Sequence, residues 1–166
     1  MSIIETNNLT AEQRKLIWHL WNEEYPKQMQ YQTIEEFDNY LNNLRQHYHL
    51  LALDDDSNVI GWAFLFERDN EKWFAIIVAT KMQRQGIGTQ LLQLLKEKEE
   101  VLNGWAADHD RYQTNSGASY PSPVQFYLKN GFIILPDIRI ETEQLSAVKI
   151  KWTKASSSIR KRDALD

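Results

Sequence analysis

Two stretches near the start of the chain place apolar residues at helical spacing, each behind a residue suited to begin a helix. Thr10 and Gln13 have the spacing of a capping box, in which each side chain bonds the backbone amide of the other. Pro26 closes the first stretch, because proline cannot continue a helix. Thr33 and Glu36 repeat the capping signal before the second stretch. The sequence therefore predicts two amphipathic helices, each with one buried face.

Shorter apolar runs bounded by turn residues predict strands. They cover Ser2–Thr6, His49–Leu53, Val59–Phe66 and Trp73–Ala79, and the last is apolar enough to predict burial on both of its faces. The last three should form an antiparallel set. The acidic segment 54–58 lies between two of these runs. We interpret it as a hairpin turn rather than a metal site, because no suitably spaced ligands follow it.

The second half of the chain continues with a longer helix and a strand. This strand should run parallel to the one at 73–79, since a crossover helix joins them. Ser122 with Pro123 predicts the start of a short helix, and Asn130–Gly131 predicts its end. The other predicted elements are a helix over 91–100, a strand over 101–107, a long segment without periodicity over 108–121, and a closing hairpin with strands over 132–142 and 143–152.

Composition indicates a globular chain and excludes some classes of function. The 166 residues suit one domain, and a hydrophobic content of 42% with 25% charged residues is typical of soluble proteins. The net charge of −4 argues against nucleic-acid binding as the main function. We see neither a signal peptide nor an apolar run that spans a membrane, so we expect a cytoplasmic protein without a membrane partner. We assign 1–153 to a single domain and the polar segment 154–166 to a disordered tail.

Side chains suited to metal binding or covalent catalysis are few. The chain has no cysteine, which removes disulfides, thiolate metal sites and cysteine nucleophiles from consideration. His47 and His49 stand close together, but no third ligand is spaced near them. We therefore expect no metal.

The segment from Gln83 to Thr89 contains Gly86 and Gly88, two of the six glycines in the chain, between a strand-like and a helix-like run. Glycine costs about 0.5–1 kcal/mol relative to alanine in regular structure, so the pair needs a reason. One interpretation is a tight turn that feeds a helix onto a sheet. The other is close approach of a ligand, because the free amides and the dipole of a helix N-terminus suit phosphate. The glycines alone do not decide between the two.

The order of the predicted elements and two motifs resemble the GNAT superfamily of acyl-CoA-dependent N-acetyltransferases. Gln83-x-x-Gly86-x-Gly88 matches that family's Q/R-x-x-G-x-G/A signature, at a strand-to-helix junction. Segment 126–132, Phe-Tyr-Leu-Lys-Asn-Gly-Phe, is similar to the family's second motif. The resemblance covers roughly residues 1–153. It implies an α+β fold of the α/β type, with a mixed, mostly antiparallel sheet of about seven strands flanked by about four helices.

The resemblance also implies that acetyl-CoA binds as a co-substrate. It would lie between the strands at 73–79 and 101–107, with its diphosphate on the amides of 84–89. Its pantetheine arm would pair with the backbone of 76–78. The backbone N–H of Val78 would polarise the thioester carbonyl. The implied coenzyme contacts are Ile76, Ile77, Val78, Gln83, Arg84, Gln85, Gly86, Ile87, Gly88 and Thr89.

Catalysis, by the same resemblance, is direct attack of an amine on the thioester. Tyr127 matches the family's general acid, which would protonate the departing thiolate, although a core aromatic on a short helix is the alternative for it. A general base is needed if the amine arrives protonated. The candidates are Glu67, Asp108 and His109, which also fit ordinary exposed strand ends.

The sequence does not identify the acceptor amine. The segment 108–121 and the first two helices should shape its site, which would be lined by some of Trp18, Trp21, Tyr25 and Tyr31 unless they pack in the core. A non-catalytic acyl-CoA-binding or sensor module stays open as another function. So does an acetyltransferase acting on charged tRNA, which the acidic pI disfavours. The sequence also leaves a homodimer open.

Overall fold

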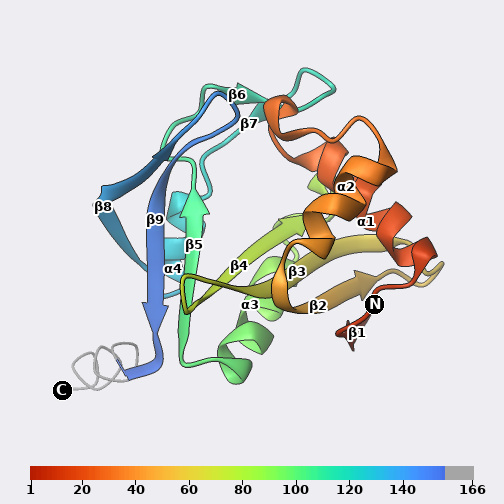
Figure 1. The fold of residues 1–166 in the computed structure, drawn as a ribbon, viewed down its shortest axis with the longest axis horizontal. Helices are drawn as coiled ribbons and strands as arrows, with labels where there is room; N and C mark the ends of the chain where they lie inside the picture. Colours follow the sequence, from red (N-terminus) through yellow and green to blue (C-terminus); the bar gives the residue numbers. More distant parts are fainter. Residues whose placement is uncertain (156–166) are drawn as a thin grey trace.

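The computed structural model describes residues 1–155 and shows a mixed sheet with helices on both faces (Figure 1). In this part of the chain the main sheet has seven strands, in the order β1-β2-β3-β4-β5-β9-β8, and β6 and β7 form a separate hairpin. Neighbouring strands are antiparallel except β4 and β5, which run parallel. The arrangement confirms the predicted mixed sheet with four helices. The predicted tail lies outside the described residues from position 156 onward.

The element bounds are as follows. The helices are α1 (Ala11–Glu24), α2 (Ile34–Asn42), α3 (Ile87–Lys98) and α4 (Val124–Lys129), with single 3-10 turns η1 (Lys27–Met29) and η2 (Thr80–Met82). The strands are β1 (Ser2–Thr6), β2 (Arg45–Leu53), β3 (Val59–Arg68), β4 (Glu71–Val78), β5 (Val101–Ala106), β6 (Tyr112–Gln113), β7 (Ser119–Tyr120), β8 (Ile133–Glu141) and β9 (Ser146–Thr153).

Local capping signals begin both N-terminal helices as predicted. Thr10 Oγ1 accepts a hydrogen bond from the Gln13 amide at 3.1 Å, and Gln13 Oε1 accepts one from the Thr10 amide at 2.9 Å. Thr33 Oγ1 likewise accepts from the Glu36 amide at 3.2 Å. The second box is not reciprocal, however, because the Glu36 carboxylate bonds the amide of Gln32 instead. One side chain is therefore enough to start α2.

The short helix α4 begins at Val124, one residue later than Ser122 and Pro123 predicted. Ser122 Oγ accepts the Val124 amide at 3.3 Å and donates to the carbonyl of Ala107, so it joins the helix start to the end of β5. The predicted stop is confirmed, since Gly131 has a φ of +87° that favours glycine.

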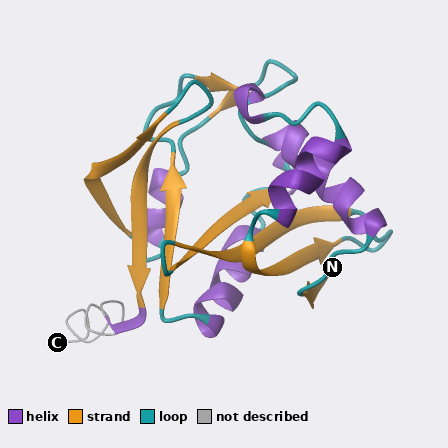
Figure 2. Cartoon of the chain, viewed as in Figure 1, coloured by secondary structure: helices purple, strands orange, loops and turns teal. Residues whose placement is uncertain are grey.

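Two helices cover each face of the sheet, and a hydrophobic cluster fills each interface (Figure 2). Phe37 and Leu41 of α2 pack with Ile17 of α1 on one face. Leu91 and Leu95 of α3 belong to the cluster on the other. No helix within residues 1–155 combines the length and apolar character that crossing a membrane requires.

Two strand-level predictions need correction, and the predicted turn between the first two strands of the antiparallel set is confirmed. β2 starts at Arg45 rather than at His49, because β3 pairs with it further than the apolar run extends. The acidic segment forms the predicted turn, in which Asp54 Oδ1 accepts the amide of Asn58 at 2.8 Å. The prediction that 73–79 is buried on both faces is wrong in part. Ile76 and Val78 are only half-buried, because β4 leaves its neighbour β5 along this stretch.

His49 is a buried imidazole held by hydrogen bonds on both ring nitrogens. The Trp62 indole N–H donates to His49 Nδ1 at 3.2 Å, and His49 Nε2 lies 2.8 Å from His47 Nδ1. Because Nδ1 accepts, the proton of the neutral ring sits on Nε2 and points to His47. Burial, reinforced by repulsion from His47 and Arg14, lowers the pKa of His49 to about 3. The two histidines therefore belong to the packing of β2 on β3.

We expect this imidazole to make the fold sensitive to acid. The unfolded chain gains the proton near pH 6.5 and the folded chain only near pH 3, so stability falls as pH drops between these values. His49 should contribute a loss of about 2 kcal/mol in unfolding free energy between pH 7 and pH 5. Urea denaturation at both pH values, with His49→Gln and the exposed His19→Gln as control, measures it. An equal loss in wild type and His49→Gln would contradict the assignment.

Candidate active site

The parallel strands β4 and β5 separate just beyond their first contact. Trp73 and Asn103 are their one registered pair, and the strands diverge toward their carboxyl ends (Figure 1). The Phe74 ring occupies the space beside Gly104, where a Cβ atom would lie only 2.8 Å from its Cε1. Glycine at this position therefore lets an aromatic side chain sit beside the β5 backbone where the strands part.

The edge of β4 that faces this opening carries free backbone groups. The amide of Ala79 donates to Ile60 of β3 at 2.9 Å. Because N–H groups alternate along a strand, those of Ile76 and Val78 point to the other edge, toward the opening. The Val78 carbonyl on that edge accepts the Gln83 side-chain amide at 3.1 Å. An extended, amide-bearing ligand can therefore pair with β4 here.

The turn between β4 and α3 presents backbone amides to solvent. Arg84 and Gly86 both have left-handed backbone angles, with φ of +65° and +83°. No side chain caps α3, and the amide of Gln90 is bonded to the Gly86 carbonyl. The amides of 87–89 precede that bond and have no intrahelical acceptor. A Cβ at Gly86 would meet nothing within 4 Å, so the space beside Gly86 at the start of the helix is open. Such a concavity of amides at a helix start suits an anion.

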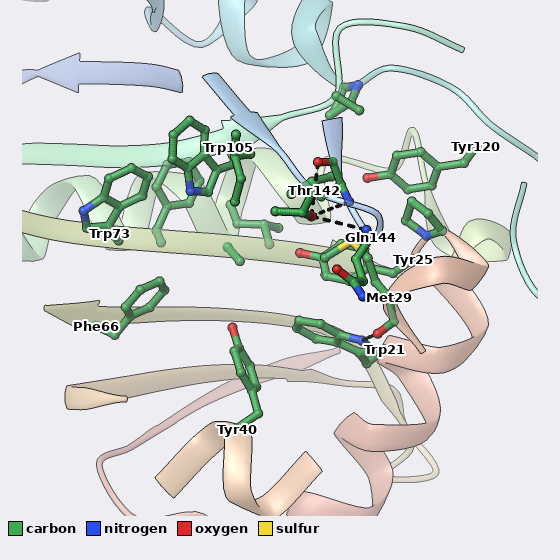
Figure 3. A pocket seen from close by; sticks show the side chains of 18 of the residues that line it. Trp21, Tyr25, Met29, Tyr40, Phe66, Trp73, Trp105, Tyr120, Thr142 and Gln144 are labelled. Carbon is green, nitrogen blue, oxygen red and sulfur yellow. Dashed lines mark hydrogen bonds between the residues drawn. The ribbon is translucent and has the colours of Figure 1, made fainter. Parts of the chain in front are cut away.

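The opening leads into a cavity of about 320 Å³ on the α1 side of the sheet (Figure 3). Its walls come from α1, η1, α2, the end of β3, the middle of β4, β5, the β7–α4 segment, and the end of β8 with the β8–β9 turn. Ten lining residues are aromatic, and none within the described chain is Asp, Glu, His or Lys. The aromatic residues are Trp21, Tyr25, Tyr31, Tyr40, Phe66, Trp73, Phe74, Trp105, Tyr120 and Tyr127.

Tyr127 lies where this cavity meets the opening between the strands. Its ring packs edge-on against Phe74 at 5.7 Å, and its side chain lines the cavity. Burial, with repulsion from Tyr120, raises the pKa of Tyr127 above its ordinary value of 10.0. Burial raises the pKa of Tyr120 to about 12, and that of Tyr25 is raised well above 10.0. All three hydroxyls therefore stay protonated near neutral pH and can donate hydrogen bonds.

The carboxylates proposed as bases lie outside the cavity. Phe66 and Arg68 line it, so Glu67 between them points to the other face of β3 and lies 3.9 Å from Lys72 Nζ. Asp108 accepts two hydrogen bonds from the Arg139 guanidinium, at 2.7 and 3.1 Å. The bonds from Arg139 lower the pKa of Asp108, which makes it a weaker base.

His109 is also held by its own turn. Its Nδ1 accepts the amide of Arg111 at 3.2 Å, so its buried Nε2 carries the proton and has no acceptor within residues 1–155. A group of three potential metal ligands does not occur in this part of the chain.

The lining of this cavity was predicted only in part. Trp21, Tyr25 and Tyr31 line the cavity, whereas Trp18 donates to the Tyr31 carbonyl at 2.8 Å outside it. The long segment 108–121, which contains β6 and β7, contributes Tyr120. The sequence reasoning missed Arg68, Trp105 and the β8–β9 turn with Gln144. Trp105 sits in an apolar strand, but the turn residues carry no local signal for a binding site.

Solved structures of similar fold include several acetyltransferases. An aminoglycoside 6'-N-acetyltransferase complexed with coenzyme A is 14% identical, with 93% of this chain and 97% of that chain covered at a TM-score of 0.69. A spermidine N-acetyltransferase variant from Vibrio cholerae is 16% identical, with 97% and 99% covered at a TM-score of 0.65. The aminoglycoside 6'-N-acetyltransferase from Enterococcus faecium is 16% identical, with 93% and 97% covered at 0.63. At these identities the likeness concerns the fold.

Sequence comparison adds the family. No curated protein matches the chain at significant similarity. The family model for the acetyltransferase (GNAT) domain matches residues 46–134, which include β4, the glycine turn, α3 and Tyr127. This match spans more than half of the chain, which therefore belongs to the GNAT acetyltransferase family.

Proposed function

We propose that the protein is an N-acetyltransferase that moves an acetyl group from acetyl-CoA to a primary amine of a small molecule. The observation that carries the proposal is the separation of β4 from β5, which leaves the amides of Ile76 and Val78 unpaired beside the aromatic-lined cavity. The glycine turn with free amides lies at the end of the same strand. We assign the activity to a single domain over residues 1–153.

The coenzyme would be held mainly by backbone groups. Its diphosphate would bind the amides from Arg84 to Thr89, where the backbone angles and the α3 dipole favour negative charge. Its pantetheine arm would pair with the free edge of β4 at 76–78, beside the side chain of Gln83, which already bonds the Val78 carbonyl. Gln85 and Ile87 belong to the same turn and would contribute their backbone amides to the diphosphate site.

Acetyl transfer proceeds by direct attack. The amine nitrogen forms a bond to the thioester carbon, and the Val78 N–H stabilises the negative charge that develops on the carbonyl oxygen. The C–S bond then breaks, and the electron pair leaves with sulfur. Tyr127 donates its proton to the departing thiolate as a general acid. The amine nitrogen loses a proton as the amide forms, and this proton passes through water to the Tyr127 phenolate, which restores the hydroxyl.

The cavity supplies no strong base, so the amine enters neutral. Glu67 and Asp108 are each paired with a cation away from the cavity, and the lining within residues 1–155 has no carboxylate or imidazole. The ammonium form of an acceptor would therefore lose its proton to water before binding. Only the neutral amine can attack the thioester, because attack uses the nitrogen lone pair that the proton occupies in the ammonium form.

Acetyl-CoA is expected to stabilise the folded protein. At 100 times its Kd, a ligand that binds only the folded state adds about 2.7 kcal/mol to the free energy of unfolding. Thermal or urea unfolding with and without acetyl-CoA measures this gain. No gain at millimolar acetyl-CoA would contradict the coenzyme site.

Turnover is followed separately, by release of free thiol with a panel of primary amines. The chain has no cysteine, so the protein itself adds no thiol signal. Stabilisation by acetyl-CoA without acetylation of any amine would instead support a non-catalytic acyl-CoA-binding module.

A further inference from the structure

The chemistry of the cavity wall restricts which amines can enter it. Ten aromatic side chains line it, and the described part of the chain adds neither a carboxylate nor a lysine. A ligand with several positive charges needs carboxylates to replace its lost hydration, because burying an unpaired charge is costly. A flat, apolar molecule, in contrast, gains stacking contacts from the same walls. The cavity therefore fits an acceptor with an aromatic body better than a polyamine or an aminosugar.

Among residues 1–155 one cation lines this cavity, at the end away from the glycine turn. The Arg68 guanidinium carbon lies 5.1 Å from the centre of the Phe66 ring and 5.8 Å from that of Trp73. Both distances are within the range of a cation–π contact, so the two rings hold the guanidinium at this end of the cavity.

Arg68 differs from the other cations of this region in having no anionic partner. Its exposed guanidinium makes no hydrogen bond or ion pair with residues 1–155 of the kind that Asp108 offers Arg139 and Glu71 offers Lys149. The indole N–H groups of the nearby Trp73 and Trp105, in contrast to Arg68, are buried, and they too have no acceptor in this part of the chain. Donors thus outnumber acceptors at this end of the cavity, which favours an anionic group there.

The positions along β4 give the length of the acceptor. Arg68 pairs in register with Glu71 at the start of β4, and Val78 ends the strand. The Arg68 guanidinium itself lies over the Trp73 ring, so the distance that matters runs from Trp73 to Val78, and at about 3.3 Å per residue it is roughly 16 Å. An acceptor whose amine reaches the thioester near Val78 can reach Arg68 only if its anion is at the far end of an elongated body. The cavity volume of about 320 Å³ fits a small molecule.

We propose that the acceptor is a small, elongated primary amine with an aromatic body and a carboxylate at the end remote from the amine, and that Arg68 binds this carboxylate. The inference rests on the proposed function, since it places the amine beside the thioester. The aromatic walls hold the body, and the guanidinium edge pairs with the carboxylate through two parallel hydrogen bonds.

Two matched probes and one contrasting probe test this proposal. The matched pair is a 4-(aminoalkyl)benzoate and the corresponding 4-(aminoalkyl)benzamide, which differ only in the charge of the remote group, and the contrasting probe is spermidine, a polyamine. Wild type should use the benzoate at least tenfold better in kcat/KM than the benzamide, mainly through KM, and spermidine least. Arg68→Gln should bring the ratio of benzoate to benzamide close to one, and Arg68→Glu should reverse it. Arg45→Gln, which changes an exposed arginine outside the cavity lining, should keep the wild-type ratio.

Binding measurements separate a failure of this inference from a failure of the proposed function. Each probe is added to the CoA-bound protein, and the shift in Tm is compared between wild type and Arg68→Gln. An Arg68-dependent preference for the benzoate without any turnover supports the acceptor class and contradicts the acetyltransferase assignment. A benzoate preference that survives Arg68→Gln, a preference for spermidine, or no binding of any probe overturns the inference. Acetyl-CoA stabilisation, measured alone, reports on the coenzyme site in every variant.

Discussion

Tyr127→Phe is expected to lower kcat about a hundredfold, because loss of a general acid typically costs a factor of 10² or more. The substitution removes only the hydroxyl, and the ring keeps its edge-on contacts with Phe74 and Phe132. Acetyl-CoA affinity and stability should therefore stay close to those of wild type. The raised pKa of the Tyr127 hydroxyl keeps it protonated, so wild-type kcat should show no loss below pH 10 from its ionisation. Steady-state kinetics over pH, with any amine that is turned over, measure both effects.

Two other tyrosines define how this result is interpreted. Tyr48→Phe removes a hydroxyl that bonds Glu5, away from the cavity, and should leave kcat unchanged. Tyr120→Phe removes a second buried hydroxyl from the cavity itself. A large loss of kcat in Tyr120→Phe with none in Tyr127→Phe would move the general acid to Tyr120 and refute our assignment.

Gly86→Val is expected to weaken acetyl-CoA binding about a hundredfold, which corresponds to the loss of two charge-assisted hydrogen bonds at about 1.5 kcal/mol each. Valine is strained at the φ of +83° found here, so the turn should relax to another conformation. The amides that face the open space would then turn away from the diphosphate. Isothermal titration with acetyl-CoA, and with CoA, measures the change in Kd.

Gly117→Val is the matched control for that experiment. Gly117 has a φ of +87°, and a Cβ there would also meet nothing within 4 Å, but it lies in the β6–β7 hairpin. Both variants should therefore lose similar stability from backbone strain, while only Gly86→Val loses coenzyme affinity. Equal affinity in the two variants would mean that the glycine turn serves packing alone.

The glycine turn itself shows where sequence reasoning reached its limit. The spacing of Gly86 and Gly88 left a tight turn and a ligand cradle equally open. The structure shows that the two positions differ. Gly86 needs its left-handed backbone and faces open space, whereas a Cβ at Gly88 would lie 3.3 Å from the Phe126 ring. Gly86 therefore lies on the open side of the turn, whereas Gly88 allows α4 to pack closely.

Residues paired across the sheet could not be assigned from the chain alone. Asp108 and Arg139 are far apart in sequence, and their ion pair forms only because β9 places β8 close to the end of β5. In a strand, the side chain of Glu67 must point to the face opposite Phe66 and Arg68. Which of these two faces of β3 holds the cavity depends on where α1 packs. Both residues were reasonable base candidates until these contacts were known.

The sequence by itself determined most of the elements and their order, though not the β6–β7 hairpin, because those elements depend on short-range physics. The Thr10 capping box, the stop at Gly131 and the alternation along the strands act between residues a few positions apart. The position of the opening and the walls of the cavity, in contrast, depend on the tertiary structure alone. The strands part beside Gly104, and the cavity that opens there takes its walls from α1, β3, β5 and the β8–β9 turn. Such a cavity is the space that distant side chains leave between them, and no local pattern encodes that space.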